Sequence, residues 1–204
     1  MNSARYLTGV SANDKLWSPA QGMGEVNLGV AFDGAPRFLR DQMSVDKFTG
    51  TGQRRAYVGQ VVDSTKPFRV TVAWTAAPGH TSGVAYYNDL DLTVIIGGNT
   101  YKGNVFNGQF STTGGTADAK NNVESVFLPA GVSGEFTVLV TAANINSDGV
   151  PNEAPSLDQD FALVIYNSTA TNTPAYTSAA AAFSGLFFEA GGAEVGRSCA
   201  ITLN

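Results

Sequence analysis

The stretch "NDLDLTVII" (88–96) decides the fold class of this chain. Apolar residues occupy every second position from Leu90 to Ile96, whereas Asp89 and Asp91 fall on the opposite face. A period of two residues is the pattern of a β-strand that turns one face to the core. The segment therefore predicts a half-buried strand. It also carries two carboxylates of a residue type that strands usually avoid.

The same alternation recurs in five other segments, which are separated by turns rich in Gly, Pro, Asn and Asp. These segments are "RRAYVGQVV" (54–62), "FRVTVAWT" (68–75), "NVESVFL" (122–128), "EFTVLVTAA" (135–143) and "DFALVIYN" (160–167). Short strands at this spacing predict an all-β fold, namely an antiparallel jelly-roll β-sandwich or barrel of about eight strands. In front of it, "NSARYLTGV" (2–10) predicts the end of a short helix, which Gly9 would stop.

The composition supports a β-rich domain and excludes some partners. A chain of 204 residues with 43% hydrophobic content can build one core with an attached segment. Its 23 glycines and 14% charged residues are typical of turn-rich β proteins. A net charge of −5 without a Lys/Arg cluster argues against nucleic acid or an anionic membrane as partner. No apolar run has membrane-spanning length, and the first residues lack the apolar core of a signal peptide.

Residue types that serve covalent catalysis are scarce. His80 is the single histidine, in the turn "APGHTSG" (77–83), and no G-x-S-x-G nucleophile elbow accompanies it. Cys199, the single cysteine, can form no internal disulfide, and we expect an incidental thiol. Asp89 and Asp91 would lie roughly 6–7 Å apart, as in some glycosidases, but any solvated strand face gives this distance. The sequence therefore predicts no catalytic site.

Calcium is a better chemical interpretation of the two aspartates, because hard cations bind carboxylate and carbonyl oxygens on loops and strand ends. The segment "DAKNNVE" (118–124) adds further oxygen donors, which are Asp118, Asn121, Asn122 and Glu124. The stretch "NINSDGVPNE" (144–153) does not fit an EF-hand loop, because Pro155 stands where the last ligand is needed. It favours an Asx-rich turn. A structural role, in which Asp89 and Asp91 accept hydrogen bonds from backbone N–H groups, stays open.

Seven segments of the chain, taken in order, resemble the C-terminal region of one protease family. They are "QGMGEVNL" (21–28), "KPFRVTVAWTAAPG" (66–79), "NDLDLTV" (88–94), "YKGN" (101–104), "NNVESVF" (121–127), "GEFTVLVTAANI" (134–145) and "QDFALVIYN" (159–167). The family is that of the subtilisin-like serine proteases, in the large alkaline subgroup. Members of this subgroup carry a jelly-roll β-barrel, similar to a P-domain, after the peptidase domain.

The resemblance implies a division of the chain into three parts. Residues 1–52 would be the C-terminal tail of the peptidase domain with a connector, residues 53–168 the jelly-roll β-sandwich, and residues 169–204 a linker and the start of a following β domain. The family's catalytic motifs are absent, since His80 is followed by Thr-Ser rather than Gly-Thr, and no Gly-Thr-Ser-Met-Ala occurs. We therefore expect the non-catalytic accessory region of a secreted bacterial serine protease. Its partner would be the peptidase domain of the same protein.

The resemblance also implies calcium, which members of this family bind in and near the barrel. The matching acidic and amide positions are Asp89, Asp91, Asn121, Asn122 and Glu124. The alternative function is a carbohydrate- or protein-binding β-sandwich module, because a fold alone does not fix a function. Such a module would need a row of exposed aromatic rings. The candidate rings are Tyr86, Tyr87, Tyr101 and Phe106. We favour a place in the core for them.

Overall fold

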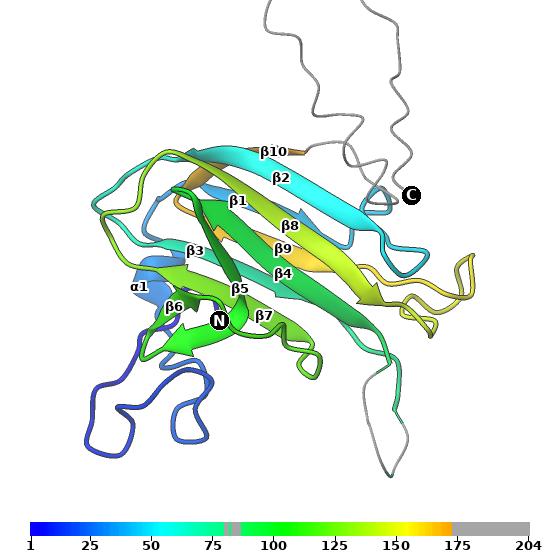
Figure 1. Cartoon of the computed structure of the whole chain (residues 1–204), viewed down its shortest axis with the longest axis horizontal. Coiled ribbons are helices and arrows are strands. Elements are labelled where there is room, and N and C mark those ends of the chain that lie inside the picture. The colour runs from blue at the N-terminus through cyan, green and yellow to red at the C-terminus, as the bar shows by residue number, and fades with distance from the viewer. Residues whose placement is uncertain (80–81, 83–86, 173–204) are drawn as a thin grey trace, which may run out of the picture.

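The computed structural model describes residues 1–79, 82 and 87–172, which build an antiparallel β-sandwich (Figure 1). Cys199 and nearly all of the predicted linker and following domain lie outside the described residues. Within the described ranges, no helix has both the length and the apolar character needed to cross a membrane.

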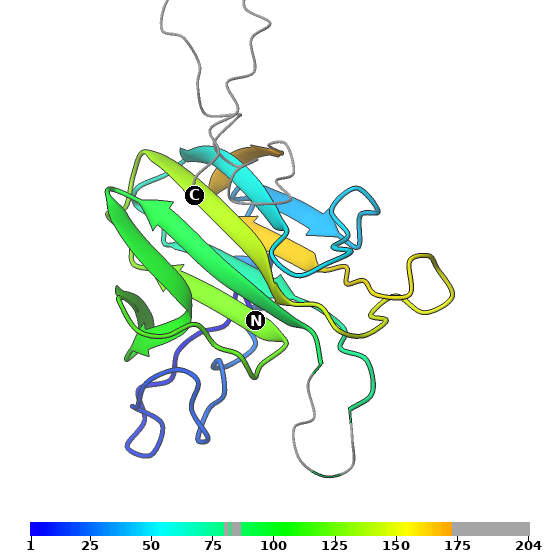
Figure 2. The same cartoon turned by 45° about the vertical axis from the view of Figure 1, so that its right-hand side comes forward.

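The strands pair into two antiparallel sheets, which the view in Figure 2 shows as two layers. The first sheet contains, in spatial order, β1 (Arg37–Asp41), β9 (Ala162–Tyr166), β3 (Phe68–Ala73) and β7 (Val123–Leu128). The second contains β10 (Ser168–Asn172), β2 (Arg54–Val61), β8 (Glu135–Asn144), β4 (Asp89–Ile96), β5 (Asn99–Asn107) and β6 (Phe110–Thr113). The predicted antiparallel sandwich is confirmed, and the described residues contain ten strands in place of about eight.

The core lies between the two sheets and is built by the alternation seen in the sequence. In β4, Leu90, Leu92 and Val94 are buried while the residues between them are partly exposed. The opposite sheet contributes its own buried side chains, and Phe68 of β3 meets Phe136 of β8 with ring centroids 4.8 Å apart. Each such apolar side chain stabilises the fold by about 1.5–3 kcal/mol when fully buried. This packing fixes which face of β4 its two aspartates occupy.

The segment before the sandwich does not form the predicted N-terminal helix. Arg5 instead pairs in an antiparallel bridge with Glu25, and each backbone N–H donates to the other's carbonyl at 2.9 and 2.8 Å. The extended backbone needed for this pairing is incompatible with a helix. The helix α1 (Leu28–Ala31) comes later, and it starts at Asn27, whose side chain accepts a hydrogen bond from the N–H of Val30 at 3.1 Å.

Residues 1–27 nevertheless pack on the sandwich, in blue beside β6 and β7 in both views (Figures 1 and 2). A small apolar cluster joins them to it, formed by Leu16, Met23, Phe106 and Phe127. The guanidinium of Arg69 on β3 lies 4.6 Å from the ring centroid of Phe127. It also donates to the carbonyl oxygens of Asn2 and Ala4 at 3.1 and 2.7 Å. The chain start is thus tied to the first sheet by both apolar and polar contacts.

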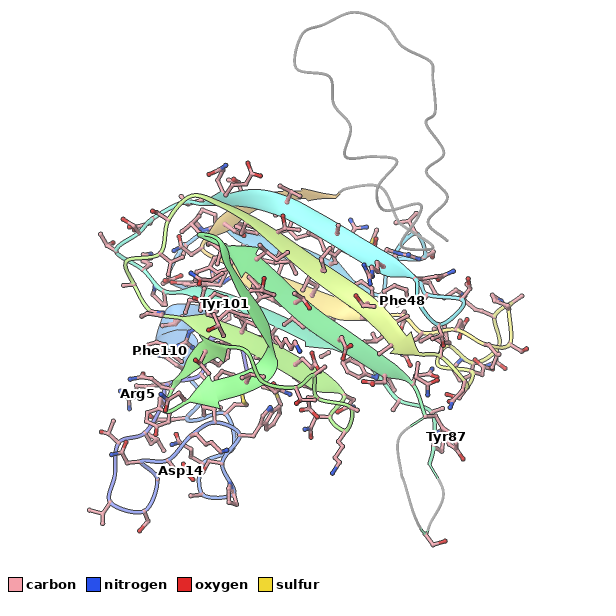
Figure 3. The ribbon with its side chains drawn as sticks, in the orientation of Figure 1. Arg5, Asp14, Phe48, Tyr87, Tyr101 and Phe110 are labelled. Carbon is pink, nitrogen blue, oxygen red and sulfur yellow. The ribbon has the colours of Figure 1, made fainter. Side chains whose placement is uncertain are left out.

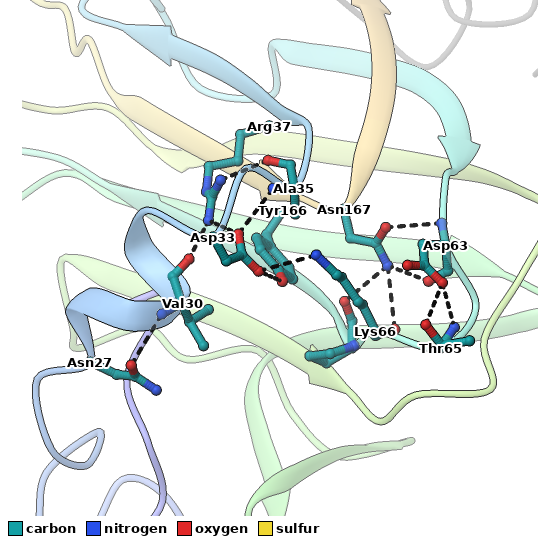
Figure 4. Close-up of polar contacts among 11 residues, drawn as sticks. Asn27, Val30, Asp33, Ala35, Arg37, Asp63, Thr65, Lys66, Tyr166 and Asn167 are labelled. Atoms are coloured by element: carbon teal, nitrogen blue, oxygen red, sulfur yellow. Dashed lines mark hydrogen bonds and ion pairs between the residues drawn. The ribbon is translucent and has the colours of Figure 1, made fainter.

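The stretch between α1 and β1 is held by the Asp33 carboxylate (Figure 4). It accepts hydrogen bonds from the Tyr166 hydroxyl at 2.6 Å, the Arg37 guanidinium at 2.9 Å, the Ala35 N–H at 3.0 Å and the Lys66 ammonium at 3.4 Å. Burial acts to raise the pKa of Asp33, but these hydrogen bonds together hold it well below its usual range. An ionised Asp33 therefore joins this stretch to β1, to the turn before β3 and to β9.

Strand pairing extends beyond the predicted boundaries of the sandwich at both ends. Strand β1 pairs with β9 over its whole length, so the sandwich includes residues ahead of the predicted boundary at residue 53. Strand β10 pairs with β2 and continues past residue 168 into the predicted linker. Both are edge strands with one pairing partner each, which explains their weak alternation in the sequence.

Candidate metal centre

The candidate ligands gather where β4 and β5 separate. The two strands pair only as far as Thr93 and Lys102, after which β5 leaves toward β6. The backbone N–H of Leu92 would then lack a strand partner. The Glu124 carboxylate, from β7 in the other sheet, takes that place, and its Oε2 accepts the Leu92 N–H at 2.6 Å. One buried side chain thus joins the two layers of the sandwich.

Glu124 is enclosed to an unusual degree for a carboxylate. Its side chain is only 1% exposed, and its second oxygen, Oε1, is buried without a hydrogen-bond partner. Gly103 of β5 lies directly against it, since a Cβ atom built there would be 2.1 Å from Oε2. Only glycine leaves room for the carboxylate at this point.

The environment of Glu124 disfavours its charge. Burial is the main cause and raises the pKa of Glu124 to about 9. The Leu92 N–H opposes this rise by stabilising the ionised form, whereas the carboxylates of Asp91, Asp118 and Asp89 add to it. Without a cation, Glu124 is therefore a neutral acid at neutral pH.

Asp89 and Asp91 lie on the face of β4 opposite the core leucines, as the alternation predicts. Burial, followed by the charges of Asp91 and Asp118, raises the pKa of Asp89 to about 6. Burial also raises the pKa of Asp91, with Lys102 acting in the opposite direction. Asp89 Oδ1 is buried and has no hydrogen-bond partner, so the structural role that the sequence left open is not fulfilled by this oxygen.

Asp118 differs from the other acids because its charge is well solvated by the protein. Burial alone would raise its pKa, but the amide groups around it lower the pKa below the usual value. Its oxygens accept hydrogen bonds from Asn104 Nδ2 at 2.7 Å, Asn121 Nδ2 at 2.6 Å and the Lys120 N–H at 3.0 Å. Asp118 therefore supplies a fixed negative charge beside the two aspartates and Glu124.

Asn104 positions this corner, and the sequence analysis did not single it out. Its backbone adopts a positive φ of 58°, which bends β5 away from β4. Its side chain donates to Asp118 and to the carbonyl of Val123 at 2.8 Å, and it accepts the N–H of Ser125 at 3.0 Å. The Gly-Asn pair inside "YKGN" (101–104), an uncommon interruption in a strand, is the signal that could have marked it.

The two predicted amide ligands hold the loop before β7. Asn121 donates to Asp118, which places it beside the acidic group. Asn122 exchanges hydrogen bonds with Trp74 at the end of β3, where its Nδ2 donates to the Trp74 carbonyl at 3.1 Å and its own carbonyl accepts the Trp74 N–H at 3.0 Å. Asn121 is therefore a closer candidate for a ligand than Asn122.

The corner as a whole is an acidic site that lacks a compensating cation. Two buried oxygens, Asp89 Oδ1 and Glu124 Oε1, have no partner. Burial, with repulsion among the acids as a further cause, raises the pKa values of both groups. Oxygen donors of this kind are the ligands that calcium prefers. In the described part of the chain, no three His, Cys, Asp or Glu side chains converge as a ready metal shell. The acids are neighbours rather than a closed cage.

No family model matches this chain, and neither does any curated protein. Its family membership therefore stays a prediction from the sequence.

The aromatic residues proposed for a binding surface do not form an exposed row among the described residues. Phe106 is buried in the small apolar cluster, and Tyr101 packs against the main core. Tyr87 lies far from Tyr101, near the other end of β4 (Figure 3). Tyr86 and the single histidine, His80, lie outside the described residues.

The loop after β8 is organised by hydrogen bonds with Asn88, which lies outside the predicted Asx-rich stretch 144–153. The buried Asn88 side chain accepts the N–H groups of Asn146 and Ser147 at 2.9 and 3.0 Å. It donates in turn to the carbonyl of Asp158 at 3.0 Å and to the side chain of Gln159 at 2.9 Å. This loop is thus a second polar centre, separate from the acidic corner.

Proposed function

We propose that this chain is a calcium-binding accessory β-sandwich of a secreted bacterial subtilisin-like serine protease, without catalytic residues of its own. The single observation that carries the calcium part is the pair of buried, unpartnered oxygens on Asp89 and Glu124 in an acidic corner. A buried polar atom without a partner costs about 1–3 kcal/mol, and more when it is charged. A bound cation would remove that cost.

Each acid would have a distinct part in holding the ion. Glu124 would offer Oε1 while Oε2 keeps the Leu92 N–H, so that the ion is linked to both sheets. Asp89 and Asp91 would approach from β4, with Asp118 as a fixed charge beside them. Calcium supplies a positive charge that favours the ionised carboxylates and lowers their pKa values. The expected result is a sandwich that resists local opening.

The protease part of the proposal rests on the seven sequence segments and agrees with one surface feature. Helix α1 has no buried residue. Leu28 and Phe32 at its two ends are 64% and 83% exposed, and Val26 just before it is 82% exposed. Apolar side chains gathered in this way mark a surface that another protein covers. The peptidase domain preceding this segment in the same protein is the proposed partner.

Calcium titration tests the first part directly. We expect added calcium to raise the melting temperature and a chelator to lower it, with about 2.7 kcal/mol of stabilisation at a hundredfold excess over Kd. Glu124→Gln should abolish this shift, because the amide keeps an oxygen for Leu92 N–H but loses the charge. Glu135→Gln, at an exposed position at the start of β8, is the matched control and should retain the shift. If added calcium left the melting temperature of the original protein unchanged, the proposed calcium site would be refuted.

The coding sequence upstream of this chain tests the second part. It should encode the three catalytic motifs of the subtilisin family. In the whole protein, Phe32→Ser should lower the melting temperature and shorten the half-life of protease activity, whereas the exposed Val62→Ser, distant in sequence, should not. An upstream sequence without these motifs would contradict the proposal.

A shallow hollow of about 350 Å³ favours a carbohydrate- or protein-binding module as the second candidate. It is lined by apolar Trp17 and Phe106 and by charged Lys15 and Asp118. This mixture suits a small polar ligand, since pockets of this size combine rings with a few polar groups. Titration with soluble oligosaccharides, followed by tryptophan fluorescence, should show saturation that Trp17→Phe weakens. If the tryptophan fluorescence did not change with added oligosaccharide, the carbohydrate-binding function would be excluded.

A further inference from the structure

A buried ion pair outside the acidic corner joins two distant parts of the chain. The Lys47 ammonium lies 3.0 Å from Asp158 Oδ2, and the side chains are 11% and 0% exposed. The other oxygen of Asp158, Oδ1, accepts the N–H of Val150 at 3.0 Å. The carboxyl group is therefore fixed in orientation, with one oxygen directed at the amine.

The backbone holds both reacting residues in place. Phe48 and Gln159, the residues following Lys47 and Asp158, exchange two hydrogen bonds in an antiparallel bridge, at 2.8 and 2.9 Å. Both are fully buried. Since side chains alternate along paired strands, Lys47 and Asp158 share the face opposite Phe48. Figure 3 marks Phe48 at this end of the sandwich, near the loop after β8.

A third group completes the arrangement. Glu153 Oε2 lies 3.1 Å from the same Lys47 nitrogen, and its side chain is 59% exposed. The carbonyl of Ala154 accepts a further hydrogen bond from this nitrogen at 3.2 Å. Glu153 thus touches the amine from the solvent side and can exchange protons with water.

We propose that Lys47 and Asp158 condense to an intramolecular amide, with Glu153 as the proton carrier. Transfer of one proton from the Lys47 ammonium to the Asp158 carboxylate gives a neutral amine and a carboxylic acid, while Glu153 stays ionised. The Lys47 nitrogen then attacks Asp158 Cγ, forming an N–C bond. Glu153 takes the proton released by the nitrogen and delivers it to the departing hydroxyl. The C–O bond breaks and one water leaves, with no oxidant or reductant involved.

The energetics favour the product but slow the reaction. A buried ion pair carries the desolvation cost of two charges, and a neutral amide removes that cost. The Lys47 ammonium donates hydrogen bonds to Asp158 and Glu153, which raises the pKa of Lys47, so the ammonium form dominates at neutral pH. The reaction therefore proceeds from a minor neutral pair. Fixed neighbours compensate for this, because oriented intramolecular groups reach effective concentrations of about 10⁵–10⁸ M.

The bond would close the chain into a loop that contains β2 to β8. Lys47 precedes the first of these strands and Asp158 follows the last. The unfolded chain would then keep Lys47 and Asp158 together, which lowers its conformational entropy and so stabilises the folded state. Such a tie suits a protein that meets proteases.

Intact-mass spectrometry of the full chain under denaturing conditions tests whether the amide between Lys47 and Asp158 forms. After incubation at neutral pH, we expect the mass to be one water below the sequence mass, with a digest that yields one peptide linking Lys47 to Asp158. Lys47→Arg keeps the ion pair but offers no reactive amine, so its mass should equal its sequence mass. A full sequence mass for the original protein, after days of incubation in the folded state, would overturn the proposal.

Glu153→Gln tests the proton carrier separately at an exposed position that does not endanger folding. General acid–base catalysis contributes about 10²–10⁴-fold, so loss of water should be at least about a hundredfold slower in this variant. Equal rates in the variant and the original protein would exclude Glu153 from the reaction.

Discussion

A single residue, Glu124, links the sequence of this protein to its architecture. As a neutral acid it caps one strand N–H and leaves one oxygen without a partner. Its carboxylate form is disfavoured, because burial and, after it, three other acids raise its pKa. The position of Glu124 also explains why residue 103 is glycine, since any larger residue there would occupy the space of Oε2.

Gly103→Ala should therefore destabilise the protein by about 1–3 kcal/mol, the usual cost of overpacking a filled core. Urea unfolding at neutral pH measures it. Gly50→Ala is the control, because open space surrounds that position and its φ is not positive. The shorter Glu124→Asp should reduce the penalty of Gly103→Ala, as expected for residues in contact. Additive effects of the two substitutions would show that Gly103 does not owe its identity to Glu124.

Among the elements, the sequence predicted those strands that bury every second residue. Strands β2, β3, β4, β7, β8 and β9 agree with the predicted segments to within a few residues. The short edge strands β1, β6 and β10 were not predicted. One face and one edge of each are exposed, so their sequences alternate too weakly to indicate a strand. In β5 the alternation is broken by the bend at Asn104. The acids of the candidate metal site were found by residue type, whereas Asn104 and Gly103, which position them, were not.

The junction between β9 and β10 depends on one residue, Asn167, where the chain passes from one sheet to the other (Figure 4). Its φ is 65°, its side chain is fully buried, and its Nδ2 donates to the carbonyls of Asp63, Lys66 and Pro67. Its Oδ1 accepts the Asp63 N–H at 3.0 Å. The Asn167 side chain therefore provides hydrogen-bond partners for backbone groups in the turn after β2, while its backbone forms the junction between β9 and β10.

Asn167→Gly should cost about 2–3 kcal/mol, because it keeps the backbone conformation but leaves buried backbone groups unpaired. Asn167→Ala should cost about 1–2 kcal/mol more, because it adds the strain of a positive φ. Chemical denaturation of both variants measures the two differences. Equal stabilities of the Gly and Ala variants would show that the junction relaxes and that the backbone conformation is not required.

At the scale of the whole molecule, the acidic corner couples the sandwich to pH and, under the proposed function, to calcium. Its acids come from β4 in one sheet, β7 in the other and the loop before β7, so a charge change there affects the contact between the layers. Among the described residues of the main core cluster, Tyr57 can ionise, but burial raises its pKa far above neutrality. The pH dependence of unfolding near neutrality therefore reports mainly on this corner.

The chelated protein should lose stability as pH rises from 6.5 to 8. The pKa of Glu124 is about 9 in the folded state and 4.5 when unperturbed, so between these values the folded state binds the extra proton and unfolding becomes easier with rising pH. One such group changes the free energy of unfolding by at most about 1.4 kcal/mol per pH unit. Asp89, with a pKa of about 6, contributes mainly below this window.

Saturating calcium should flatten or reverse this slope, because the ion binds the ionised carboxylates and its affinity rises with pH. Thermal melts at several pH values, with calcium or with chelator, measure both slopes. Glu124→Gln removes the titrating group and should show the same shallow slope in either condition. If the chelated Gln variant still lost stability as steeply as the original protein, the pH dependence would originate elsewhere. The two sheets would then not be coupled through Glu124.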